Sequence, residues 1–98
     1  MNLNQCREKI DEIDTQLLAL LNRRAEMSTV IGMLKTRAGL LIVDAERESE
    51  VLRRIARDNP GDLDDQAAAR IYRQILDESR RLQARTRVEG IAKAEAGE

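Results

Sequence analysis

The 98-residue sequence contains no histidine and only one cysteine, Cys6. Histidine and clustered cysteines are the usual ligands of transition metals, and histidine is the usual base that activates a nucleophile. Their absence argues against metal sites of this kind and against a histidine-activated nucleophile. One cysteine cannot form an intrachain disulfide, and its place on an apolar line predicts a small core residue. Any catalysis must use charge and shape.

Aromatic residues are almost missing, since Tyr72 is the only one and neither Phe nor Trp occurs. The apolar residues are nearly all Leu, Ile, Val, Ala and Met. This composition argues against a β-sandwich and against a surface on which nucleic-acid bases stack. We therefore expect an all-α protein.

Neither sign of charge dominates, because the formal net charge is -1. The chain should have no general attraction to nucleic acid or to an anionic membrane. Arginines are frequent between residues 70 and 87, but Asp77 and Glu78 lie among them at spacings typical of surface ion pairs. We interpret this segment as a solvated helix face.

Long hydrophobic runs are also absent, and the longest, LLALL and GLLIV, are far too short to cross a bilayer. The first ten residues, MNLNQCREKI, do not form an apolar signal segment. The expected location is the cytoplasm.

Helical periodicity divides the chain into three segments. A heptad pattern from Leu3 predicts a first helix of about 34 residues, with Gly39 as its terminator. Asp44 is a good N-cap for a second helix over 45–57, and DNPGD at 58–62 is the clearest break. A third helix is predicted from about Leu63 to Arg87, followed by a frayed or disordered tail. Its expected inward residues are Ala68, Ile71, Ile75, Leu76 and Leu82.

The first helix presents an apolar seam with one charged residue, Arg24. The seam consists of Leu3, Cys6, Ile10, Ile13, Leu17, Leu20, Met27, Ile31 and Leu34. A helix of about 50 Å is too long to be covered by two shorter helices of its own chain, so we expect it to pair with a second copy. Because an unpaired buried charge is costly, Arg24 is either a device that sets helix register or a contact to an anion.

Polar residues replace apolar ones on the inward face of every predicted helix. Arg24, Ser28 and Lys35 do so on the first helix, Asp44, Arg47 and Glu48 on the second, and Ser79 and Gln83 on the third. The alternative for the second group is a capped first turn with surface ion pairs. Three helices that become polar over a limited length predict a polar pocket inside a bundle.

The spacing of basic residues on the first helix predicts a site shared between two chains. Arg24 and Lys35 lie about 16 Å apart on one face, whereas Arg7 is about 42 Å from Lys35. If two copies pack antiparallel about an axis near residue 18, Arg7 of one chain falls between Arg24 and Lys35 of the other. Two identical pockets result. Such cations, with carboxylates and an amide, suit a small dianion bearing a hydroxyl.

Four segments carry a family resemblance: CREKIDEID, LLNRRAEMSTVIGMLK, VDAERE and ILDESRRLQ. Over about residues 3–84 the chain resembles the all-helical chorismate mutases, including mutase domains fused to prephenate dehydratase or dehydrogenase. The resemblance implies an intertwined helical homodimer and places a mutase domain at 1–87, with 88–98 as a flexible tail or the start of a linker. It implies an isomerase of aromatic amino acid biosynthesis that converts chorismate to prephenate without a metal, cofactor or covalent intermediate.

The resemblance also assigns roles, position by position. It implies that Arg7 of the second subunit and Arg24 bind carboxylates, and that Lys35 binds a carboxylate and the ether oxygen. On the second helix it implies a trio, Asp44, Arg47 and Glu48, in which Glu48 binds the substrate hydroxyl. On the third helix it implies a pair, Ser79 and Gln83, in which Gln83 binds the ether oxygen. Lys35, Glu48 and Gln83 are the expected catalytic residues. Two alternatives remain: an isochorismate pyruvate lyase of the same fold, against which Asp44 and Glu48 argue, and a non-catalytic helical dimerisation module.

Overall fold

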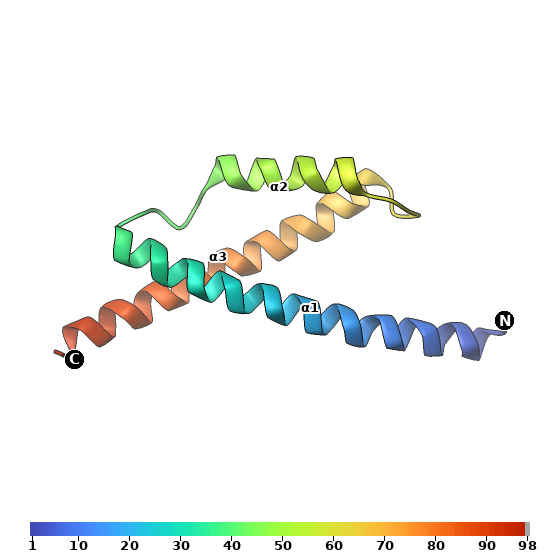
Figure 1. Ribbon diagram of the computed structural model, residues 1–98, viewed down its shortest axis with the longest axis horizontal. Helices are drawn as coiled ribbons and strands as arrows, with labels where there is room; N and C mark the ends of the chain where they lie inside the picture. Colours follow the sequence, from blue (N-terminus) through green and yellow to red (C-terminus); the bar gives the residue numbers. More distant parts are fainter. Residues whose placement is uncertain (98) are drawn as a thin grey trace.

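Three α-helices build the part of the chain that the structure, a computed structural model, describes, residues 1–97. They are α1 (Leu3–Ala38), α2 (Ala45–Asp58) and α3 (Asp65–Glu95), and no strand occurs in these residues (Figure 1). The all-α prediction is confirmed. None of the helices within 1–97 combines the length and the apolar character needed to span a membrane.

Local capping signals fix both ends of α1. Asn2 and Gln5 form a capping box, in which each backbone N–H donates to the other side chain at 2.9 Å. At the other end Gly39 adopts the left-handed conformation, with φ of 67°, and the Leu40 N–H donates to the Lys35 carbonyl at 2.9 Å. Glycine takes this conformation without steric cost, so the predicted terminator is confirmed.

Aspartates begin the other two helices. The Asp44 carboxylate accepts from the Arg47 N–H at 3.0 Å, which confirms the predicted N-cap of α2. Asp64 accepts from the Ala67 N–H at 2.7 Å and caps α3. The third helix was predicted to begin at about Leu63. It begins two residues later, at Asp65, because Asp64 is its N-cap.

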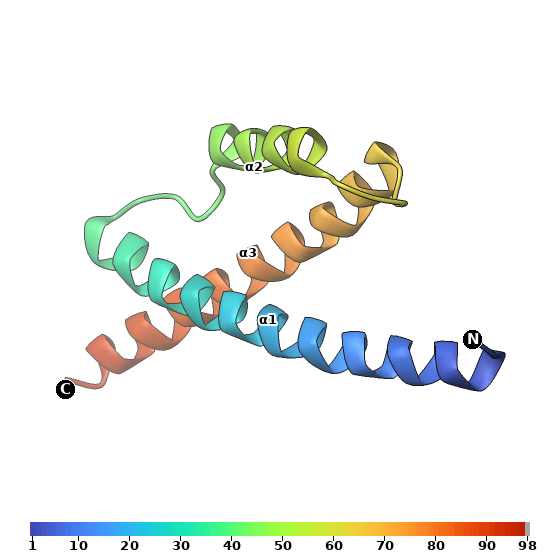
Figure 2. The same ribbon diagram turned by 45° about the vertical axis from the view of Figure 1, so that its right-hand side comes forward.

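The helices lie almost in one layer, with overall dimensions of 61 × 28 × 14 Å. The C-terminal half of α1 crosses α3, α2 packs on the N-terminal half of α3, and the N-terminal half of α1 extends away from both (Figures 1 and 2). The buried apolar residues among those described are Val51, Ala68 and Leu76. Most of the apolar seam of α1 is consequently exposed in the single chain.

Gly32 marks the closest approach of α1 to α3. A Cβ atom at this position would lie 2.9 Å from the Gln83 Cα and 3.2 Å from its carbonyl oxygen. A glycine inside a helix costs about 1 kcal/mol relative to alanine. Here its missing side chain lets the two backbones meet where Gln83 enters the cavity.

The predicted end of the third helix near Arg87 is wrong, because α3 continues to Glu95. Arg87 donates from Nε to the Thr36 hydroxyl at 3.2 Å and from Nη2 to the Leu40 carbonyl. Gly90 lies close to the Thr36 methyl group. These contacts to the end of α1 support the added turns. Whether 88–98 begins a linker stays a prediction, and Glu98 lies outside the described residues.

Two expected core residues are exposed in the single chain. Cys6 lies on the projecting half of α1, where none of the described elements covers it. Ile71 is 49% exposed, although it was expected to face inward. It lies on the face of α3 that neither α1 nor α2 buries, whereas Ala68 and Leu76 are buried as expected.

Candidate active site

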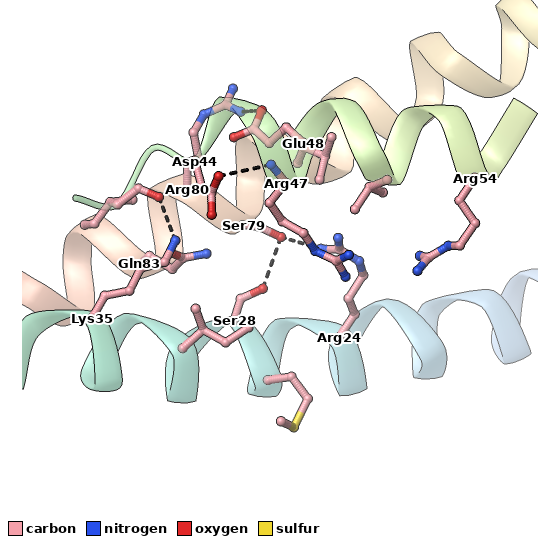
Figure 3. Close-up of a pocket in the computed structure, with 15 residues that line it drawn as sticks. Arg24, Ser28, Lys35, Asp44, Arg47, Glu48, Arg54, Ser79, Arg80 and Gln83 are labelled. Atoms are coloured by element: carbon pink, nitrogen blue, oxygen red, sulfur yellow. Dashed lines mark hydrogen bonds and ion pairs between the residues drawn. The ribbon is translucent and has the colours of Figure 1, made fainter. Parts of the chain in front are cut away.

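A cavity of about 420 Å³ lies between the three helices (Figure 3). Its walls come from α1, from the segment that leads into α2, from α2 itself and from α3. The lining residues are Arg24, Met27, Ser28, Ile31, Lys35, Ile42, Asp44, Arg47, Glu48, Val51, Arg54, Leu76, Ser79, Arg80 and Gln83. The apolar members shape the cavity, and the polar ones supply its chemistry.

The structure brings together every predicted site residue except Arg7. The residues Arg24, Lys35, Asp44, Arg47, Glu48, Ser79 and Gln83 all line the cavity. Arg7 is exposed on the projecting half of α1, far along the helix from Arg24 and Lys35. α2 and α3 pack away from this half of α1, so Arg7 does not reach the cavity of its own chain.

A hydroxyl pair holds Arg24 at the floor of the cavity. Arg24 Nη1 donates to Ser79 Oγ, and the Ser28 hydroxyl donates to the same oxygen at 3.1 Å (Figure 3). Ser28 is only 4% exposed and Ser79 9%. The remaining N–H groups of the guanidinium stay available for an anion, and a guanidinium binds a carboxylate best with two parallel hydrogen bonds.

Lys35 and Gln83 form a second donor group at the other end of the cavity. Lys35 Nζ donates to the Ile42 carbonyl at 2.7 Å and to Gln83 Oε1 at 2.9 Å (Figure 3). An ammonium has three N–H donors, so one remains. The Gln83 oxygen is occupied by Lys35, which leaves the amide NH₂ as the free part of this side chain. Both residues can therefore donate to one acceptor.

The first turn of α2 contributes the acidic side of the cavity. Asp44 caps the helix, and Glu48 accepts a hydrogen bond from Arg80 of α3. Arg47 pairs with Glu50 at 2.5 Å, an exposed pair within one turn. The surface ion pair that was the alternative for this group is thus present at Arg47, which nevertheless lines the cavity together with Asp44 and Glu48.

Arg80 joins Glu48 to a carboxylate behind it. Arg80 Nη2 donates to Asp77 at 3.1 Å, and its Nη1 donates to Glu48. The pKa of Arg80 is raised above its ordinary value, mainly by the hydrogen bond to Glu48, while burial acts in the opposite direction. Arg80 is therefore a permanent cation at the wall of the cavity.

Two polar lining residues, Arg54 and Arg80, were not predicted, and Ser28 was predicted as an inward polar residue without a role in the site. Ser28 lies one turn from Arg24 on the same face, the spacing that identified it. Arg54 extends from α2 toward α1 (Figure 3) and lies two turns after Arg47, so the same rule applies. Arg80 lies four residues after Leu76 and three before Gln83, so helical spacing could have identified it too, but it was interpreted as part of the solvated face.

The charge balance of the cavity favours an anionic ligand. Five lining side chains are basic, namely Arg24, Lys35, Arg47, Arg54 and Arg80, against the two acidic residues Asp44 and Glu48. Within residues 1–97 no group of three His, Cys, Asp or Glu side chains is placed to hold a metal ion. The arrangement can bind carboxylates, accept from a hydroxyl and donate to an oxygen that gains negative charge.

Comparison with known proteins identifies a family. The family described as chorismate mutase type II matches residues 6–84. A bifunctional chorismate mutase/prephenate dehydratase of Aquifex aeolicus is 40% identical over 78 residues, which are 76% of this chain and 22% of the relative. The chain thus spans about a fifth of the length of this relative.

Solved structures share the fold over nearly their whole length. A chorismate mutase of Thermus thermophilus superposes with a TM-score of 0.83 at 30% identity and covers 85% of this chain and 94% of that one. A chorismate mutase of Helicobacter pylori in complex with prephenate superposes with a TM-score of 0.79 at 27% identity, and the match covers 86% of this chain and 91% of that one.

Proposed function

The chain belongs to the chorismate mutase type II family, and we propose that its cavity binds chorismate and converts it to prephenate, a step of phenylalanine and tyrosine biosynthesis. The observation that carries the proposal is the Lys35 and Gln83 donor pair facing a cavity that also holds Arg24 and Glu48. Chorismate is a dianion with two carboxylates, a ring hydroxyl and an enol ether. The cavity offers a partner for each of these groups.

The carboxylates are the groups that fix the substrate. Arg24 is held by Ser79 and keeps free N–H donors for one of them. Arg7 of a second chain, which would lie between Arg24 and Lys35 along α1, is proposed to bind the other. Holding both ends selects the chair-like conformer in which the two reacting carbons approach each other, so that part of the entropic cost is met on binding.

The ring hydroxyl is assigned to Glu48. A carboxylate has two oxygens, and Arg80 occupies Oε1, which leaves Oε2 to accept from a hydroxyl. Asp44 and Arg47 are proposed to complete this side of the site.

Rate acceleration is assigned to Lys35 and Gln83. As the ether C–O bond lengthens, its oxygen gains negative charge, and donors already in place stabilise that charge without reorganising. Lys35 has one N–H left after its bonds to Ile42 and Gln83, and the Gln83 NH₂ lies beside it. The reaction needs no nucleophile and no proton transfer.

A homodimer is part of the proposal because the apolar seam of α1 is exposed in the single chain and a second copy would bury it. Ile10 is 55% exposed, Leu17 51% and Leu20 56%. An apolar groove of about 250 Å³ between α1 and α3 adds to this surface. Antiparallel pairing of two α1 helices buries these residues and brings Arg7 of each chain to the level of Thr29 of the other.

The test is incubation of the purified protein with chorismate and, separately, with isochorismate, with products followed by NMR. We expect prephenate from chorismate at a rate well above the uncatalysed one and no pyruvate from isochorismate. Pyruvate release would instead assign a lyase, and no change in either substrate would leave only a dimerisation module. Heat-denatured protein is the control.

A further inference from the structure

Among the described residues, two cations in the cavity wall, Arg54 and Arg80, have no contact with the substrate in the proposed reaction, and of these Arg80 is bonded to a residue that has one, Glu48. Arg80 belongs to a run of arginines on α3 that was predicted to form surface ion pairs. Its neighbour Arg81 does so, with Asp77 at 3.1 Å and Glu78 at 2.8 Å. Arg80 instead crosses from α3 to α2 and meets Glu48.

From this crossing we propose that Arg80 is a positioning residue, which holds the Glu48 carboxylate in the orientation that accepts the substrate hydroxyl. The inference rests on the proposed function and extends it. It names a residue whose contact with the substrate is indirect and whose effect passes through Glu48.

The geometry around Glu48 supports this role. Glu48 lies in the first turn of α2, and its hydrogen bond to Arg80 comes from another helix. The two side chains are 25% and 31% exposed, so the pair is partly withdrawn from water. A glutamate has several rotatable bonds, and a charge-assisted bond from a second element restricts them.

Arg80 is itself fixed from behind. Its Nη2 donates to Asp77 at 3.1 Å, one turn earlier on α3. Asp77 also forms an ion pair with Arg81. Positive and negative side chains therefore alternate from the surface of α3 to the cavity. A guanidinium has a rigid fork of donors and can serve Asp77 and Glu48 at once, which a lysine ammonium on a flexible stem does less well.

The test is a set of substitutions in the active wild-type protein. Arg80→Met keeps the length of the side chain and removes the charge. If Arg80 acts by orienting a group that binds the hydroxyl equally in the ground and transition states, KM should rise about tenfold and kcat should change little. Arg85→Met is the matched control, because it removes an exposed arginine of the same helix whose ion pair is with Glu89, outside this network, and KM should stay near the wild-type value.

A double-mutant cycle with Glu48→Gln separates positioning from general support of the fold. Once Glu48 is replaced, the additional substitution Arg80→Met should change KM less than twofold, because its target is gone. A similar rise in KM in both backgrounds would overturn the proposal, as would equal behaviour of Arg80→Met and Arg85→Met. Arg80→Lys restores the charge without the fork and should recover only part of the loss, and full recovery would exclude the fork as the cause.

Two further points keep the result decisive. If Arg80→Met does not fold, as judged by circular dichroism, Arg80→Gln takes its place in the same cycle. Failure of the proposed function is seen separately, as a wild-type protein that leaves chorismate unchanged. Failure of this inference is seen only in the variants of an active protein.

Discussion

Lys35 donates two of its three N–H groups to the Ile42 carbonyl and to Gln83, and one N–H remains free. This use of its donors explains why a neutral amide suits position 83. The Gln83 oxygen accepts from Lys35 at 2.9 Å, which turns the NH₂ group away from the ammonium. A carboxylate there could also accept from Lys35, but under the proposed function it would present a negative oxygen to the ether oxygen of the substrate. In that proposal the identity of a single atom decides whether the pair stabilises or opposes the developing charge.

The variant Gln83→Glu tests this directly. Near pH 7 the introduced carboxylate is ionised, and we expect activity to fall by about a hundredfold or more, because one donor to the ether oxygen becomes a negative acceptor. Activity should return as pH falls toward about 4, where the carboxyl becomes protonated and can donate. A pH–rate profile measures it. Gln66→Glu, an exposed change in the first turn of α3, is the control, and a flat profile for Gln83→Glu would contradict the assignment.

Lys35→Ala separates a catalytic from a structural role. We expect kcat to fall by about a hundredfold to a thousandfold, because a donor at the ether oxygen is lost. Stability should fall by only about 1 kcal/mol, the usual worth of the lost hydrogen bonds. Steady-state kinetics and thermal melts measure the two effects. Arg37→Ala, which removes the other basic residue from the last turn of α1, should lower kcat far less.

At the scale of the element, the crossing of α1 and α3 fixes the site. Arg24, Ser28 and Lys35 line the cavity on one side of the crossing, and Ser79 and Gln83 on the other. Gly32 lies between Ser28 and Lys35 and permits the close approach at Gln83. Helix caps set where each helix begins and ends. The close contact of Gly32 with Gln83 sets how the donors on α1 and α3 lie relative to each other.

Gly32→Ala should therefore destabilise the protein, although alanine is normally the better helix former. Its Cβ would lie 2.9 Å from backbone, so α3 must shift, and overpacking of this kind costs about 1–3 kcal/mol. We expect a Tm lower by several degrees and reduced kcat at equal protein concentration. Gly90→Ala is the matched control, because its Cβ would meet Thr36 at an ordinary 3.9 Å. That change should leave Tm unchanged or raise it, and the same loss in both variants would exclude the close approach as the cause.

At the scale of the whole molecule, the single chain is an open arrangement with a small core. Its longest helix exposes apolar residues over most of its length, and the predicted site residue Arg7 lies on the part that no other described element covers. Both features are explained by the same proposal, a two-fold dimer with shared sites. Stability and activity would then depend together on protein concentration.

Mixing two inactive variants tests the shared site. Arg7→Ala and Lys35→Ala are unfolded together and refolded at equal concentration. In a mixed dimer the pocket on the Arg7→Ala chain keeps its own Lys35 and receives an intact Arg7, while the other pocket loses both. About half of randomly formed dimers are mixed, so about a quarter of wild-type activity should return in the chorismate assay. Each variant refolded alone is the control, and a mixture no more active than their average would exclude donation between chains.

Local sequence patterns determined much of the architecture. The heptad seam gave α1, Gly39 and Asp44 marked a helix end and a helix start, and helical spacing placed the predicted polar residues other than Arg7 on faces that line one cavity. These features follow from interactions within a few residues, namely caps, turn conformation and the repeat of 3.6 residues, which is why they can be read from one chain.

Tertiary packing decided the rest. The added turns of α3 depend on Arg87 reaching Thr36 and Leu40, and the place of Arg80 depends on Glu48 lying opposite on another helix. Periodicity gives the direction in which a side chain leaves its own helix. It does not give the crossing of helices or the partner that a long arginine meets, because both are set by contacts between residues far apart in the chain.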